Sequence, residues 1–130
     1  MIDYKYILIV DNNEPSNFLH SDAVRDSFPN SEIISYTNST VFTIACLAHS
    51  EWFENETLLL LDSNMPINFG YDVLEEIEEE IDDLDHLSVL MVTSSNLKRD
   101  VERAVRFSSI KGYVGKLLGE AKMRVQLANS

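Results

Sequence analysis

The chain has 130 residues, a length typical of one domain with a single hydrophobic core. Its formal net charge of −12 argues against a nucleic-acid-binding protein, because such proteins neutralise phosphates with Lys and Arg. No apolar stretch approaches the roughly 20 residues of a membrane-spanning helix, so we expect neither a nucleic-acid nor a membrane partner.

Apolar runs and helical patterns alternate along the chain, and each change of pattern marks a predicted element. Strands are predicted at residues 6–10, 32–36, 57–61, 87–93 and 112–114, and helices at 15–28, 40–49, 71–85, 97–107 and 120–127. The segment 40–49 would also suit a strand, because Val41, Phe42, Thr43 and Ile44 include β-branched and aromatic side chains. Five strand–helix units predict an α/β fold with a doubly wound parallel sheet, in one domain of residues 1–130.

Three of the predicted helices have a clear apolar side, and that of the helix at 97–107 consists of Leu97, Val101, Ala104 and Val105. In the helix at 15–28, the predicted buried stripe consists of Phe18, Leu19, Ala23 and Val24. In the helix at 71–85, it consists of Leu74, Ile77, Ile81 and Leu84. Eight of the eleven residues from 75 to 85 are acidic, and we interpret this run as a solvated helix face.

The single cysteine, Cys46, cannot form a disulfide within the chain. It lies inside an apolar segment, so we expect a buried small hydrophobe in a reducing compartment. The first residues, Met1 to Tyr4, contain an acid and lack the basic region of a signal peptide. Together these features predict a cytoplasmic location.

Acidic residues follow two of the predicted strands at the point where each strand ends. The apolar run at 57–61 leads directly to Asp62, and the run at 6–10 leads to Asp11. Because the carboxyl ends of parallel strands meet at one edge of a sheet, the two acids suggest a shared cation or phosphate site. The alternatives are that Asp62 is a turn or helix-capping residue and that Asp11-Asn12-Asn13 is turn chemistry before a helix.

The residues at four strand ends resemble the receiver domain of two-component response regulators, the CheY-like family. These residues are Asp11, Asp62, Thr93 and Lys116, accompanied by Met65-Pro66 and Gly70. The most specific segments are Leu-Asp-Ser-Asn-Met-Pro at 61–66 and Gly-Tyr-Val-Gly-Lys at 112–116, and the resemblance covers essentially the whole chain. It implies a flavodoxin-like sheet with strand order 2-1-3-4-5.

The resemblance implies that Asp62 accepts a phosphoryl group from a phosphohistidine of a sensor histidine kinase or phosphotransfer protein. It also implies Mg²⁺, held by Asp62, by the backbone carbonyl of Asn64, by Asn12 and, through water, by Asp11. Hard oxygen ligands of this kind suit Mg²⁺. Such a domain phosphorylates and dephosphorylates itself, so we expect a signalling protein and not an enzyme acting on an external metabolite.

The same resemblance assigns switch roles to three further residues. Lys116 would pair with Asp62 and then with a phosphoryl oxygen, and the Thr93 hydroxyl would donate to another phosphoryl oxygen. Tyr113 would couple Thr93 to the surface of the fourth helix, fifth strand and fifth helix. The arginines of that surface, Arg99, Arg103 and Arg106, share one face of the helix at 97–107. They could either be solvated or contact an acidic downstream protein, and the sequence leaves open whether the domain forms a homodimer.

Two departures from the family pattern are relevant to function. Asn12 stands where the family usually has a second acid, which predicts weaker Mg²⁺ binding and slower phosphorylation. Leu117 follows Lys116 where the family usually has a cis proline, and a trans bond is expected because a cis bond before a non-proline residue costs about 2.5–4 kcal/mol. Both support an alternative, a degenerate receiver that binds a partner without phosphorylation. A haloacid-dehalogenase-like phosphatase is a further alternative, but that family requires an acid at the position of Asn64.

Overall fold

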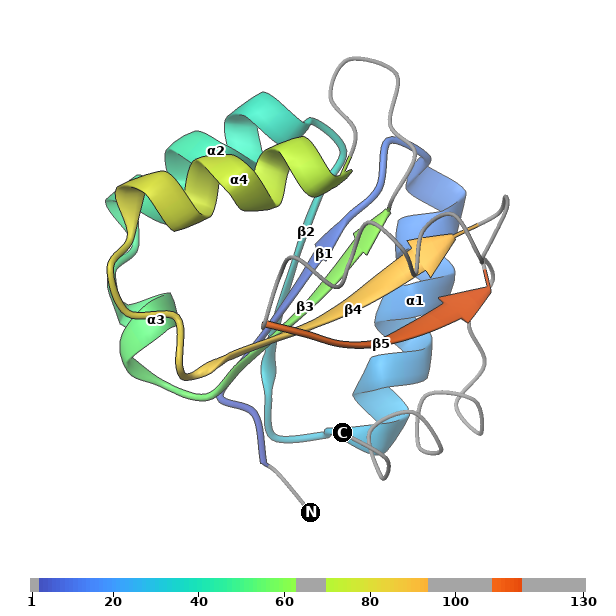
Figure 1. The fold of residues 1–130 in the computed structure, drawn as a ribbon. Coiled ribbons are helices and arrows are strands. Elements are labelled where there is room, and N and C mark those ends of the chain that lie inside the picture. The colour runs from blue at the N-terminus through green and yellow to red at the C-terminus, as the bar shows by residue number, and fades with distance from the viewer. Residues whose placement is uncertain (1–2, 63–69, 94–108, 116–130) are drawn as a thin grey trace.

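The computed structural model describes residues 3–62, 70–93 and 109–115. Its elements are β1 (Tyr6–Val10), α1 (Glu14–Ser27), β2 (Glu32–Tyr36), α2 (Ser39–Ala48), α3 (Glu51–Glu54), β3 (Thr57–Asp62), α4 (Gly70–Glu80), β4 (Leu87–Thr93) and β5 (Ile110–Gly115). The five strands form one parallel sheet in the order β2-β1-β3-β4-β5, as Figure 1 shows. The predicted α/β fold and strand order are confirmed. The helices predicted at 97–107 and 120–127 lie outside the described residues.

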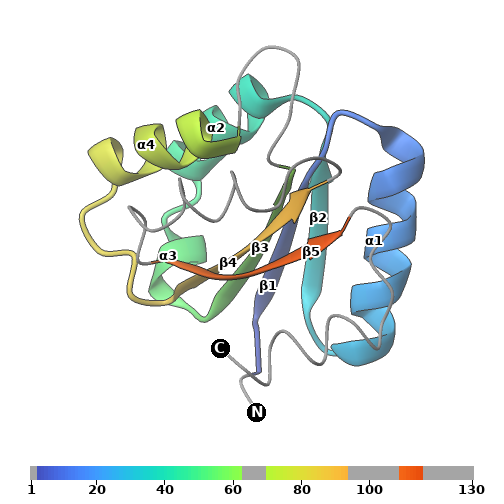
Figure 2. The ribbon, with the colours of Figure 1, turned by 45° about the vertical axis from the view of Figure 1, so that its right-hand side comes forward.

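The sheet has an apolar layer on each face. Alternate residues of a strand point to opposite faces, and the two central strands, β1 and β3, are almost entirely buried. Leu8 and Leu59 belong to the layer under α2, α3 and α4, whereas Ile7 and Leu58 belong to the layer under α1. Figures 1 and 2 show α2 and α4 side by side on one face and α1 on the other.

The segment 40–49, which also suited a strand, is helical. Asn38 caps α2 by accepting a hydrogen bond from the Val41 amide at 3.0 Å. Phe42 is fully buried and packs against the rings of Tyr36 and Trp52, at centroid distances of 5.5 and 6.4 Å. The short helix α3 was not predicted, and it places Trp52 in this aromatic cluster.

Cys46 is buried in α2, as the sequence predicted. Burial raises the pKa of its thiol to about 12, because the thiolate would lose its hydration. The side chain therefore acts as a packing residue and not as a nucleophile. No helix in the described ranges is long and apolar enough to cross a membrane.

The predicted buried stripe of α1 was partly wrong. Val24 is fully buried, but Phe18 and Leu19 are 67% and 47% exposed. The residues of α1 that face the sheet include the polar Asn17 and His20 instead. The helix is rotated relative to the prediction, and Asn17 donates from its buried side to backbone carbonyls at the ends of β1 and β2.

The predicted helix at 71–85 ends earlier, because α4 ends at Glu80. A run of acids at a helix C-terminus interacts unfavourably with the negative end of the helix dipole. The chain turns instead, with the Asp85 amide donating to Asp83 Oδ1 at 2.9 Å. Leu74 and Ile77 are buried as predicted, and Ile81 and Leu84 pack against the core from beyond the helix.

The aromatic cluster under α2 generates a prediction about stability. We expect Phe42→Ala to lower the free energy of unfolding by about 3–5 kcal/mol, because it removes a fully buried ring and leaves a cavity. Urea denaturation followed by tryptophan fluorescence measures the change. The control is Ile44→Ala on the same helix, which is 63% exposed and should change stability by about 0.5 kcal/mol or less. Equal effects of the two substitutions would contradict the described packing.

Candidate functional site

The candidate site lies where β1 and β3 end. The two strands are parallel neighbours, and the last residue pair in register is Val10 with Leu61. The next residue on each strand is an acid, Asp11 on one and Asp62 on the other, and each is only 1% exposed. Since neighbouring strands lie about 4.8 Å apart, the backbone brings these two carboxylates together at one edge. The sequence predicted this juxtaposition.

The end of β1 is held by local hydrogen bonds. The Asp11 amide donates to the Tyr36 carbonyl of β2 at 3.1 Å, which continues the strand pairing by one residue. The Asp11 Oδ1 atom accepts a hydrogen bond from the Asn13 amide at 2.9 Å, in the manner of an Asx turn. The turn chemistry considered for Asp11-Asn12-Asn13 is therefore present, and it orients a buried carboxylate at the same time.

Asn17, in α1, stabilises the same turn by two hydrogen bonds. The sequence did not single out this residue. Its Nδ2 atom donates to the Asp11 carbonyl at 3.0 Å and to the Tyr36 carbonyl at 3.2 Å. The side chain is only 5% exposed, and it bridges the ends of β1 and β2. The only sign of this role in the sequence is a polar residue one turn into a helix that follows a strand end. Such a sign is weak, because the sequence does not show which side of the helix faces the sheet.

The electrostatics of the edge call for a cation. Two carboxylates buried side by side repel each other and lose part of their hydration. A positive charge placed near them offsets both energetic costs. Their oxygen atoms are hard ligands of the kind that Mg²⁺ binds, and the exposed Asn12, which follows Asp11, could add an amide oxygen. Within the described ranges no group of three or more His, Cys, Asp or Glu residues could hold a metal. The residues present fit a cation that takes two carboxylates and completes its coordination with neutral oxygens.

The remaining predicted residues are placed only in part. Thr93 ends β4 and pairs in register with Gly115 of β5. The residue before it, Val92, pairs with Asp62 of β3, so Thr93 lies one residue beyond the level of Asp62. Tyr113 lies within β5, and for Thr93 and Tyr113 the structure describes the backbone position alone. Outside the described residues lie Asn64, Lys116, Leu117, Arg99, Arg103 and Arg106.

The comparisons with known proteins are structural. No family model matches the chain, and no curated protein matches it in sequence. A two-component response regulator from Cytophaga hutchinsonii matches with a TM-score of 0.80 and 20% identity, over 98% of this chain and 96% of its own. The chain has the fold of a response regulator receiver domain.

Two further structures support this receiver fold. The chemotaxis protein CheY4 of Vibrio cholerae matches with a TM-score of 0.72 and 15% identity, over 96% of this chain and 97% of its own. The Mn²⁺-bound form of response regulator Rcp1 matches with a TM-score of 0.68 and 24% identity, over 95% of this chain and 90% of its own. The likeness is therefore to receiver domains across nearly the full length of each chain.

The role of Asn17 can be tested by stability. We expect Asn17→Ala to lower the free energy of unfolding by about 1–3 kcal/mol, because two backbone carbonyls lose a buried donor. Chemical denaturation measures the loss, and Asp26→Ala on the exposed side of α1 is the matched control, expected within about 0.5 kcal/mol of the parent. An Asn17→Ala protein as stable as the control would show that the bridge between β1 and β2 contributes nothing.

Proposed function

We propose that this chain is a response-regulator receiver that accepts a phosphoryl group on Asp62 and signals through protein contacts. The observation that carries the proposal is the pair of buried acids at the carboxyl ends of β1 and β3, in a sheet of order β2-β1-β3-β4-β5. In open α/β sheets this edge, where the strand order reverses, is the place where ligands bind. The receiver fold of the compared structures supports the same site.

The proposed reaction transfers a phosphoryl group between two protein side chains. A carboxylate oxygen of Asp62 attacks the phosphorus atom, an O–P bond forms, and the N–P bond of the donor phosphohistidine breaks. The leaving imidazole keeps the electron pair of that bond and is neutral, since its other nitrogen carries a proton. Because the transition state spreads negative charge over three phosphoryl oxygens, the residues around Asp62 act by positioning and by charge neutralisation.

In this proposal Mg²⁺ would be held by Asn12, by Asp62, by the backbone carbonyl of Asn64 and, through water, by Asp11. The response regulator Rcp1, which has the same fold, has an Mn²⁺-bound form. When bound, the ion supplies the positive charge that two buried carboxylates and a phosphoryl group require. Asn12 contributes an oxygen but no charge, so this chain should hold the ion more weakly than a site with three acids.

The switch roles of Thr93, Lys116 and Tyr113 follow the resemblance. Thr93 ends β4, the strand beside β3, and therefore lies at the same edge of the sheet as Asp62. This position supports a contact between its hydroxyl and a phosphoryl group on Asp62. Lys116 follows Gly115, the partner of Thr93 in β5. In this proposal the histidine kinase or phosphotransfer protein is the donor, and the arginines Arg99, Arg103 and Arg106 belong to the surface that contacts the downstream protein.

A second candidate is a receiver that binds its partner without phosphorylation. Two observations favour it: Asn12 removes one negative charge from the site, and the Asp62 side chain is only 1% exposed. A phosphodonor must reach the Asp62 carboxylate, so such burial works against transfer. Chemical phosphorylation separates the two candidates.

The first test uses a small phosphodonor. With acetyl phosphate and MgCl₂ we expect the intact protein to gain the mass of one phosphoryl group, because the Asp62 carboxylate is held beside a cation site. Asp62→Asn should gain none, and Asp11→Asn should react at least about tenfold more slowly, since it loses one ligand charge. Intact-protein mass spectrometry and loss of the label at alkaline pH report the acyl phosphate. A parent protein that gains no labile mass would favour the phosphorylation-independent receiver.

The second test concerns the protein donor. Pro15 and Phe18 are exposed on α1, and Phe18 directly follows Asn17, which contacts Asp11. They line a groove between α1 and the end of β2, so they could dock a donor protein beside the site.

We therefore expect Phe18→Ala to slow transfer from the most active phosphorylated kinase of a phosphotransfer profile by about tenfold, through loss of an apolar contact. Its rate with acetyl phosphate should not change, because the small donor needs no docking surface. Radiolabel transfer measures both rates, and Leu19→Ala is an exposed apolar control on α1 that lies outside the groove. A Phe18→Ala protein slowed equally with both donors would contradict the docking role.

A further inference from the structure

The outer side of α2 carries an exposed apolar stripe. Val41, Ile44 and Leu47 are 51%, 63% and 54% exposed, and they make up three of the five large hydrophobic side chains that the described residues expose. Positions three residues apart lie on one side of a helix. The stripe is therefore continuous, and nothing in receiver chemistry at Asp62 explains it. Contiguous exposed apolar surface of this kind marks interaction sites.

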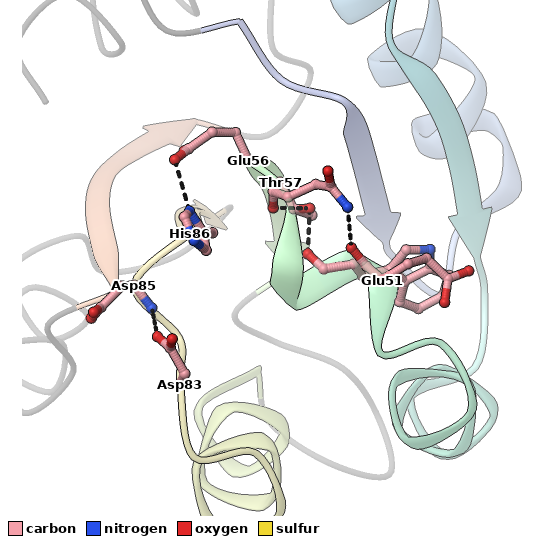
Figure 3. A network of polar contacts seen from close by, with 8 residues as sticks. Glu51, Glu56, Thr57, Asp83, Asp85 and His86 are labelled. Carbon is pink, nitrogen blue, oxygen red and sulfur yellow. Dashed lines mark hydrogen bonds and ion pairs between the residues drawn. The ribbon is translucent and has the colours of Figure 1, made fainter.

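A hollow of about 530 Å³ continues the stripe at its Leu47 end. Its apolar lining comes from Leu47, Phe53 and Ile81, and it lies between α2, α3 and the chain that follows α4. His86, the residue before β4, also lines the hollow. Its Nδ1 atom is 3.1 Å from Glu56 Oε1. Figure 3 shows the Glu56–His86 and Asp83–Asp85 contacts, and of these residues Asp83 and His86 line the hollow. The hollow can therefore receive an apolar side chain.

The rim of the hollow is acidic. Glu54, Glu80, Asp82 and Asp83 line it, and among the described residues no Lys or Arg does. The solvent side of α4, which lies beside α2 in Figures 1 and 2, adds Glu76 and Glu79. An apolar stripe next to a carboxylate-lined hollow is complementary to a surface that combines apolar and basic side chains.

We propose that the α2 stripe and this hollow form a docking surface for a basic amphipathic helix of a partner protein. One apolar side chain of that helix fills the hollow, further apolar side chains cover Ile44 and Val41, and its Lys or Arg residues pair with the acidic rim. This is helix-in-groove recognition, in which anchors recur every three or four residues.

The negative charge of the surface favours a basic helix over a second copy of the chain, an anionic lipid surface or a nucleic acid. A second copy of the chain would place the same acidic rim against itself in a two-fold dimer, and each copy carries a net charge of −12. Anionic lipid surfaces and nucleic acids would be repelled by the rim for the same reason. A basic protein segment gains both the apolar contact and the ion pairs.

The hollow is remote from the phosphorylation edge, whereas the Val41 end of the stripe lies near the end of β2. The hollow lies near residues that precede β3 and β4, such as Glu54 and His86, whereas Asp62 ends β3 at the opposite edge of the sheet. Docking there does not depend on a phosphoryl group. The inference therefore goes beyond the proposed function, and either can fail without the other.

The test uses the full chain and a designed helical peptide of Leu and Lys, about 18 residues and roughly 27 Å long. We expect titration by NMR to shift amide signals in α2, α3 and residues 76–86. Binding should weaken at least about tenfold in Ile44→Ser and in Leu47→Ser, as for an interface anchor. Glu80→Lys with Asp82→Lys should weaken binding as strongly and reduce its dependence on salt.

Matched controls keep the result specific. Leu19→Ser on α1, on the other face of the sheet, and Glu32→Lys on β2 should bind like the parent. A Leu/Glu peptide of the same spacing should not bind. The proposal is overturned if the α2 substitutions have no effect or if the Leu/Glu peptide binds equally. It is also overturned if the parent sediments as a dimer and Ile44→Ser as a monomer, because a second copy would then cover the stripe.

Discussion

The parallel pairing of β1 with β3 is the constraint on which the candidate site depends. In this register Val10 lies opposite Leu61, so the residues that follow, Asp11 and Asp62, occupy the same level of the sheet. A shift by one residue would turn one of the two acids toward the other face. The shift would also exchange the side chains of β1 and β3 between the two buried layers, and a closely packed core tolerates such changes of shape poorly. The packing of the core therefore determines the geometry of the site.

Burying two acids at one edge is unfavourable for stability and useful for chemistry. Like charges in a desolvated position favour any cation that can reach them. The backbone around Asp11 is stiffened against this repulsion by Asn17, which holds the ends of β1 and β2 together. In the proposed function this edge would receive a metal ion and a phosphoryl group, and Asn12 makes it less negative than three acids would.

The two ends of the sheet have different surface chemistry. The carboxyl edge gathers the polar residues of the candidate phosphorylation site, whereas the α2 side presents apolar residues and a carboxylate-lined hollow toward the opposite end. The acidic run after α4 contributes to this contrast, because it ends the helix early and contributes Asp82 and Asp83 to the hollow's lining. The proposed phosphoryl transfer and the proposed docking in the hollow would therefore use different ends of one small fold.

The sequence by itself determined the strands and the acids at the strand ends, because apolar runs that stop at Asp11 and Asp62 are local signals. The sheet order was implied by the family resemblance. The sequence also predicted the burial of Cys46. Tertiary structure decided which side of α1 faces the sheet, since the buried place of Asn17 depends on carbonyls of β1 and β2 that lie far from it in sequence. It also decided that Phe18 and Ile44 stay exposed, because helical periodicity identifies an apolar side but not the neighbour that covers it.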